Sequence, residues 1–135
     1  MNAETPDEAR DLRRALLCVL PLLAISPRAD AQDAAKVQPG SYRVVFENDK
    51  LRVLEYNSRP GMGVCGSGMH SHPAHLTVLL SAGRVRVRTP DGKVTQGAAM
   101  QSGTVFWSEA ETHETENVGG SAMRSLLVEL KTRPA

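Results

Sequence analysis

Residues 69–83 read MHSHPAHLTVLLSAG, so a cluster of histidines leads directly into an apolar run that ends in a turn. The cluster holds His70, His72 and His75, and the remaining histidine of the 135-residue chain is His113. Two histidines spaced i, i+2 on an extended segment point to one side, and neutral imidazole is a common ligand of divalent transition metals. Scattered histidines are usually ordinary hydrogen-bonded residues, but this clustering favours a metal site.

Outward from this stretch, the chain after residue 40 breaks into short apolar segments separated by turn residues. Segments of this length and composition are typical of β-strands. We expect strands over 42–46, 51–56, 76–80, 84–88, 104–107 and 124–130, and a hairpin over 84–93 because Pro90 and Gly92 suit its turn. The pattern predicts one all-β domain, a sandwich or small barrel with an interior large enough for one small ligand.

The net charge of +1 does not indicate a polyanionic partner, and aromatic residues make up only 4% of the chain. The basic run Arg84–Arg88 alternates with valine, as expected for a strand with one solvated face. Without neighbouring aromatic side chains to stack on bases, the run does not indicate nucleic-acid binding.

The first 31 residues have the parts of a secretory signal peptide. Basic residues precede an apolar stretch over 15–26 that is too short to span a bilayer, and Ala29 and Ala31 are small residues at a cleavage position. We therefore expect a signal peptide over 1–31, a flexible lead over 32–40 and a barrel over 41–135, in a periplasmic or secreted protein without a membrane span in its mature form. Alternatively, a retained N-terminal helix packs on the domain or a partner, and the protein is cytoplasmic.

The histidine-rich stretch resembles the first motif of the small single-domain cupins, whose barrel is a double-stranded β-helix, or jelly roll. That motif is His-x-His, three or four residues, Glu, six residues, Gly, and here His70, His72 and Gly83 match it. The glutamate is absent, because its position is Leu76 or Thr77 depending on the spacing. The resemblance covers roughly residues 42–131.

The second cupin motif is Gly, five residues, Pro-x-Gly, two residues, His, three residues, Asn. Gly103, His113 and Asn117 match it, but Glu109 replaces the proline and the interval to the histidine is one residue shorter. Within the cupins, the chain is most similar to those named β-alanine degradation proteins, which share a His-Ser-His-Pro-x-His run and a late His-x-x-x-Asn.

The resemblance implies one divalent first-row metal held by His70, His72 and His113, without distinguishing Fe, Mn, Zn, Ni and Cu. His75 is either a fourth ligand or a residue behind the ligands, because strict alternation turns it away from the face of Leu76 unless Pro73 breaks the strand. Sulfur in Met62, Cys65 and Met69 raises the alternative of copper, against ordinary packing. The glutamates around His113 are expected to be mostly solvated loop charges, although Glu109 or Glu111 is a candidate general base or a partner that orients a ligand histidine.

Two functions fit this ligand set. One is a metal-dependent enzyme, dioxygenase-like or acting through Lewis acidity, on a small polar metabolite, because three protein ligands leave coordination positions open. The other is a non-catalytic metal or small-ligand binding protein of the cell envelope. The expected partners are a small-molecule ligand or substrate and, in a homodimer, a second copy of the chain.

Overall fold

A computed structural model describes residues 32–61 and 68–132 of the chain. The predicted signal peptide, Met62 and Cys65 lie outside these residues. The described elements, in chain order, are α2 (Ala34–Val37), β1 (Tyr42–Glu47), β2 (Leu51–Ser58), β4 (His70–His72), β5 (His75–Leu79), β6 (Val85–Arg88), β7 (Val94–Gln96), β8 (Val105–Ser108), β9 (Glu111–Asn117) and β10 (Met123–Leu130).

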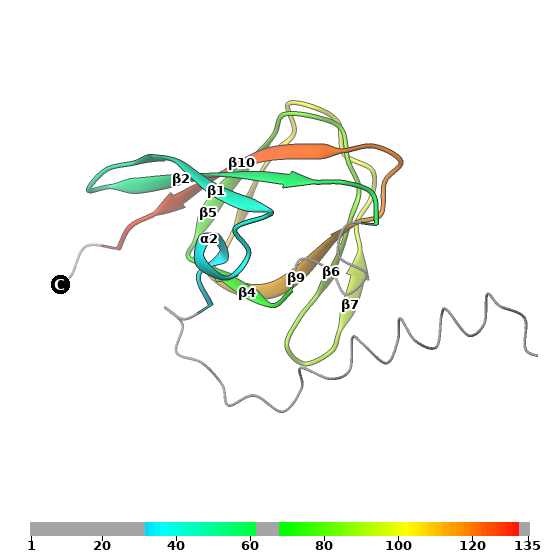
Figure 1. Cartoon of the computed structure of the whole chain (residues 1–135), viewed down its shortest axis with the longest axis horizontal. Helices are drawn as coiled ribbons and strands as arrows, with labels where there is room; N and C mark the ends of the chain where they lie inside the picture. The colour runs from blue at the N-terminus through cyan, green and yellow to red at the C-terminus, as the bar shows by residue number, and fades with distance from the viewer. Residues whose placement is uncertain (1–31, 62–67, 133–135) are drawn as a thin grey trace, which may run out of the picture.

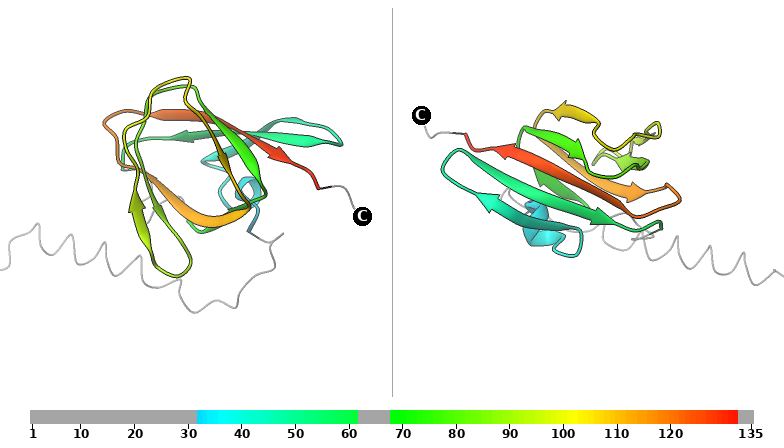
Figure 2. Two further views of the ribbon diagram at one scale, coloured as in Figure 1. Left: turned by 180° about the vertical axis from the view of Figure 1, so that it is seen from behind. Right: turned by 90° about the horizontal axis from the view of Figure 1, so that it is seen from above.

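Two antiparallel sheets face each other and enclose a common interior (Figures 1 and 2). One sheet has the strand order β1-β2-β10-β5-β8 and the other has the order β4-β9-β6-β7. Strands that are distant in the sequence are neighbours, since β10 lies between β2 and β5. This arrangement confirms the predicted all-β jelly-roll barrel.

Each of the expected strands is present, with its ends shifted by two residues or fewer. The structure adds β4, β7 and β9, of which β9 was expected to be a loop. The sequence does not show the apolar–polar alternation of a strand here, because the inward positions of β9 are polar. Among them are His113, Thr115 and Asn117. The glutamates at 114 and 116 are the outward residues of this strand, not loop charges.

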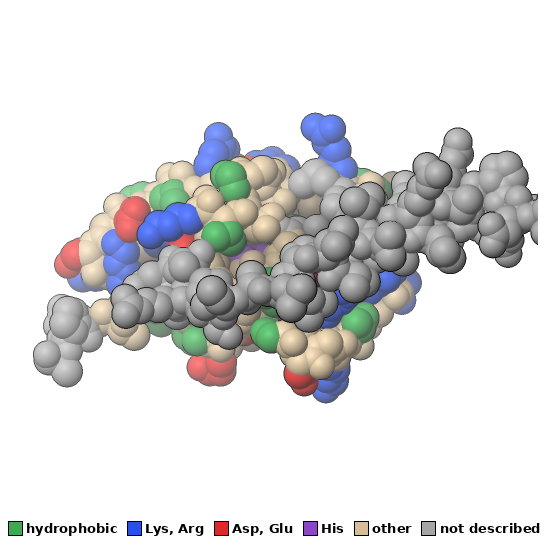
Figure 3. Space-filling model, turned by 60° about the horizontal axis from the view of Figure 1, so that its bottom comes forward, with side chains coloured by type: hydrophobic (Ala, Val, Ile, Leu, Met, Phe, Trp, Pro, Cys, Tyr) green, Lys and Arg blue, Asp and Glu red, His purple; other side chains and the backbone are tan. Residues whose placement is uncertain are grey.

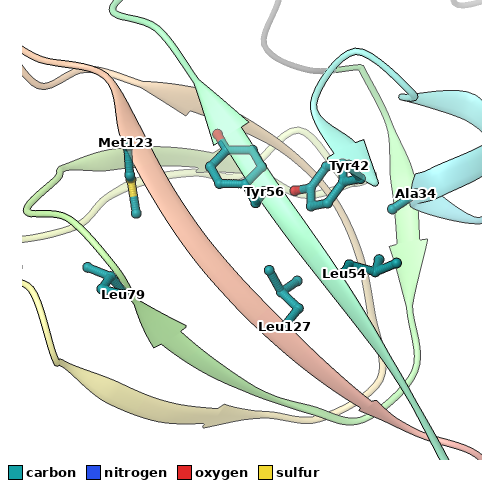
Figure 4. Close-up of a cluster of buried hydrophobic side chains, with 7 residues drawn as sticks. All are labelled: Ala34, Tyr42, Leu54, Tyr56, Leu79, Met123 and Leu127. Atoms are coloured by element: carbon teal, nitrogen blue, oxygen red, sulfur yellow. The ribbon is translucent and has the colours of Figure 1, made fainter. Parts of the chain in front are cut away.

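The apolar core lies on the inner face of the five-stranded sheet. Leu54, Tyr56, Leu79 and Leu127 are almost fully buried there, and Figure 4 shows them gathered on one side of the strands with Tyr42 and Met123. Burying each such side chain stabilises the fold by about 1.5–3 kcal/mol. The core fills one part of the interior and leaves the inner face of β4 and β9 to polar side chains.

The expected flexible lead over residues 32–40 instead contains α2, a single helical turn (Figure 1). Asp33 caps this turn by accepting hydrogen bonds from the backbone N–H groups of Ala35 and Lys36, and Ala34 is completely buried. The second Asp33 oxygen forms an ion pair with Arg52 at 2.6 Å. The cap and this ion pair fix the segment against the barrel. No helix of the described residues is long and apolar enough to cross a membrane.

The predicted hairpin is formed by β6 and β7, with Gly92 at a φ of 85° in the turn. Positive φ is easily adopted only by glycine, which explains this residue choice. Arg86 and Arg88 point outward and form ion pairs with glutamates of β9, as expected for a solvated face.

Candidate metal centre

The candidate site is built where β4 pairs with β9. In this antiparallel register His70 lies opposite His113, and His72 lies opposite Glu111. Side chains alternate along a strand, so these four positions share the inner face, while Ser71 and Thr112 occupy the other. The His-x-His spacing and the strand pairing thus place three histidines together inside the barrel.

The three histidines offer ligand nitrogens that all lie within 4.8 Å of one another. The exposed fractions of His70, His72 and His113 are 0%, 3% and 8%, and their ring centroids lie 4.9–5.4 Å apart. The structure therefore brings together the three histidines expected from the sequence as ligands.

Hydrogen bonds fix which nitrogen of two of these rings faces the interior. His70 Nδ1 lies 2.7 Å from the carbonyl oxygen of Gly68, and His72 Nδ1 lies 2.7 Å from Glu129 Oε1. A carbonyl or carboxylate oxygen can only accept, so each Nδ1 carries the proton and each Nε2 keeps its lone pair. Nε2 of His70 accepts a hydrogen bond from the Tyr42 hydroxyl at 3.0 Å, whereas Nε2 of His72 is buried with no partner. An unpartnered buried lone pair beside two other imidazoles fits a metal ion.

Burial favours the neutral form of the His70 and His72 rings. Desolvation lowers the pKa of His70 to about 3, and the neighbouring His113 and His72 rings act in the same direction. Desolvation also lowers the pKa of His72, against the opposing effect of Glu129. Since metals bind the neutral imidazole, protons do not compete with a metal for His70 near neutral pH.

Glu129 was not recognised from the sequence. It is 1% exposed, and while Oε1 contacts His72, Oε2 accepts hydrogen bonds from Arg52 Nε at 2.8 Å and from an Arg52 terminal nitrogen at 2.5 Å. Arg52 in turn pairs with Asp33, so a chain of charged contacts runs from α2 to His72. Carboxylates that hold a histidine in this way orient metal ligands in many proteins.

His75 is brought near the site but not into the three-histidine group. Its side chain is 2% exposed and faces inward, and its ring centroid lies 5.1 Å from that of His72. β4 ends before Pro73 and β5 begins at His75, so the alternation of inward and outward side chains does not continue from one strand to the next. His75 and Thr77 therefore point inward, and Leu76 points outward. Nδ1 of His75 donates to the carbonyl of Pro73 at 2.7 Å. Thr77 therefore holds the inward position where the cupin motif would place its glutamate.

Glu109 and Glu111, the two candidates for a general base or for a partner that orients a ligand histidine, have different surroundings. Glu111 points inward, with Oε2 3.3 Å from His113 Nδ1 and Oε1 3.8 Å from His75 Nε2. Interaction with His113 and with the other rings lowers the pKa of Glu111. Glu109 instead accepts a hydrogen bond from the indole of Trp107 at the exposed end of β8. Of these two residues, Glu111 is the one beside the histidines.

A cavity of about 310 Å³ inside the barrel is lined by His75 and His113 among the histidines. Apolar side chains form much of its wall, and the polar groups at its surface include His75, Thr77, Ser108, Glu111 and His113. In the space-filling view of one face, a small area of histidine surface is visible deep near the centre, while charged side chains lie at the periphery (Figure 3). A ligand in this cavity would contact His75, Glu111 and His113. Met69, which directly precedes His70 in the chain, is partly buried.

No protein-family model and no curated protein sequence matches the chain. Among solved structures, a cupin domain protein from Bordetella pertussis Tohama I aligns with a TM-score of 0.57 and 21% identity, over 67% of this chain and 92% of that one. Fe(II)-HppE in complex with an alternative substrate, (S)-1-HPP, aligns with a TM-score of 0.50 and 11% identity over 65% of this chain and 48% of that one. A cupin protein from Bacteroides fragilis aligns with a TM-score of 0.47 and 17% identity, over 83% of this chain and 86% of that one.

The chain therefore has the fold of a small cupin, as the histidine motifs predicted. Within that barrel, three buried histidines are arranged so that they could bind one metal ion.

Proposed function

We propose that His70, His72 and His113 hold one divalent first-row transition metal and that the protein is a metal-dependent enzyme for a small metabolite. The observation that carries this proposal is the buried Nε2 of His72, which has no partner while its Nδ1 is held by Glu129. A buried polar atom without a partner costs about 1–3 kcal/mol. Binding a metal would remove that cost.

Three protein ligands leave coordination positions free for a substrate, and the cavity lined by His113 supplies space beside the site. A volume of about 310 Å³ suits a small molecule. Its polar group would face His75 and His113, and its apolar remainder would contact the wall formed by Val85, Met100 and Phe106. When bound, the metal would polarise that polar group as a Lewis acid or, if it is iron, support oxygen chemistry.

Tyr42 is a second group able to act on a substrate. Its hydroxyl now donates to His70 Nε2, and burial raises its pKa well above the usual value, so it remains a donor. If His70 Nε2 binds a metal, this hydroxyl loses that acceptor, and Tyr42 remains part of the cavity wall. Thr77, Ser108 and Ser125 provide further polar groups on the cavity wall.

In the alternative function, that of a non-catalytic binding protein, the coordination positions of the metal would be closed, whereas an enzyme keeps at least one position open to its substrate. The structural neighbour HppE was solved with Fe(II), which makes Fe²⁺ the first ion to test. Protein loaded with one equivalent of Fe²⁺ without oxygen should bind nitric oxide and show the electron paramagnetic resonance signal of a high-spin iron–nitrosyl. A protein that retains Fe²⁺ but gives no such signal would have a closed site and would favour the binding function.

A further inference from the structure

The inner face of β4 and β9 carries two neighbouring cross-strand pairs of side chains. His70 and His113 make one pair, and His72 and Glu111 make the other. Side chains opposite each other across two strands start about 5 Å apart, and same-face neighbours along a strand start about 7 Å apart. Three of these four neighbouring positions hold the candidate ligand histidines, and the fourth holds a carboxylate.

The carboxylate of Glu111 lies among imidazole rings. Oε2 is 3.3 Å from His113 Nδ1, and Oε1 is 3.8 Å from Nε2 of His75, which also lines the cavity. The side chain lines the cavity and is 36% exposed, so packing does not hold it on all sides. The ligand atoms that lie within 4.8 Å of one another belong to His70, His72 and His113, and Glu111 would join them by a change of rotamer.

The other carboxylates near the site are neutralised by arginines. Glu114 and Glu116 point out of the barrel from β9 and pair with Arg88 and Arg86 at 3.7 and 3.6 Å. Glu129 binds Arg52. By contrast, the ion-pair partners of Glu111 among residues 32–61 and 68–132 are histidines, and no lysine or arginine is among the described residues that line the cavity.

From this placement we propose that Glu111 joins His70, His72 and His113 in binding the metal and replaces the carboxylate missing from the first cupin motif. The inference rests on the proposed metal site. Three neutral imidazoles leave the full charge of a divalent ion uncompensated inside the barrel, where an unpaired charge is unfavourable. One carboxylate halves that charge. Thr77, at the inward position of the missing glutamate, has no charge to offer.

The test compares Co²⁺ binding to the wild-type protein, Glu111→Gln, Glu114→Gln and His70→Ala. Glutamine has the size of glutamate but no charge, so Glu111→Gln should fold. Glu114→Gln is the matched control, because it removes an outward carboxylate three residues along the same strand. Affinity is measured by competition with a chelator, and the visible absorption of Co²⁺ reports its ligands.

We expect Glu111→Gln to bind Co²⁺ more than about 100-fold more weakly and with a changed absorption spectrum, because loss of a residue that only positions a ligand costs about 10- to 100-fold. Glu114→Gln should match the wild type. A loss of about 100-fold or less, or an unchanged spectrum, in Glu111→Gln overturns the inference. His70→Ala distinguishes this failure from failure of the metal site itself. If wild-type protein binds Co²⁺ and His70→Ala does not, the metal site stands whatever the result for Glu111.

Discussion

Removing the carboxylate of Glu129 should destabilise the metal-free protein strongly. In Glu129→Ala, His72 Nδ1 loses its acceptor in a buried environment, and Arg52 loses the two hydrogen bonds to Oε2. Breaking one side of a buried charged contact costs about 3–5 kcal/mol. Because Arg52 keeps its ion pair with Asp33, the lower end applies, about 3 kcal/mol. For a domain of this size, that corresponds to a fall in melting temperature of roughly 12 °C or more.

The assay is thermal and chemical unfolding of the metal-free variants, followed by metal affinity under conditions where they are folded. Glu129→Gln keeps the volume of the side chain and separates the loss of charge from the loss of packing. Glu116→Ala is the control, since its ion pair with Arg86 is partly solvated and such pairs contribute about 1 kcal/mol or less. Metal affinity of folded Glu129→Gln should fall about 10- to 100-fold, because His72 is no longer held in place. If Glu129→Ala unfolds like Glu116→Ala and binds metal like the wild type, Glu129 does not position His72.

Three further predictions follow from the sequence and the site. His75→Ala should weaken metal binding by about 10- to 100-fold yet leave a measurable site, because His75 lies outside the three-histidine group; a loss equal to that of His70→Ala would make it a true ligand. The free energy of unfolding of metal-free protein should fall as the pH drops from about 6.5 towards 3, since the unfolded state protonates His70 at its ordinary pKa while the folded state, with a pKa of about 3, does not; equal unfolding midpoints at pH 7 and 4.5 would contradict this. Export with cleavage after Ala31 predicts that intact mass of a periplasmic fraction gives a chain starting at Gln32, and a cytoplasmic full-length chain would contradict it.

The sequence was sufficient to predict the strands, His70 and His72 because these depend on local patterns. Apolar segments between turn residues identify strands, and the i, i+2 spacing places His70 and His72 on one face. His113 followed from the resemblance to the second cupin motif.

The remaining contacts depend on long-range pairing that no local pattern contains. Glu129 reaches His72 across 57 positions in the chain, because β10 and β4 belong to the two sheets that face each other. The position of Glu111 opposite His72 is set by the register of β4 with β9. His75 faces inward because the strand breaks at Pro73, which was the alternative to strict alternation that the sequence left open. The sequence did not indicate that Asp33 caps α2 or that it pairs with Arg52, because Arg52 lies in β2, a different element.

The central claim is that His70, His72 and His113 bind one metal ion, and metal content tests it most directly. Wild-type protein, His70→Ala, His113→Ala and the control Glu114→Gln are incubated with Fe²⁺ or Zn²⁺, freed of excess ion by gel filtration, and analysed by mass spectrometry for metal per chain. The site predicts about one ion per chain in the wild type and in Glu114→Gln, and almost none in either histidine variant. Equal metal content in all four folded proteins would contradict the assignment.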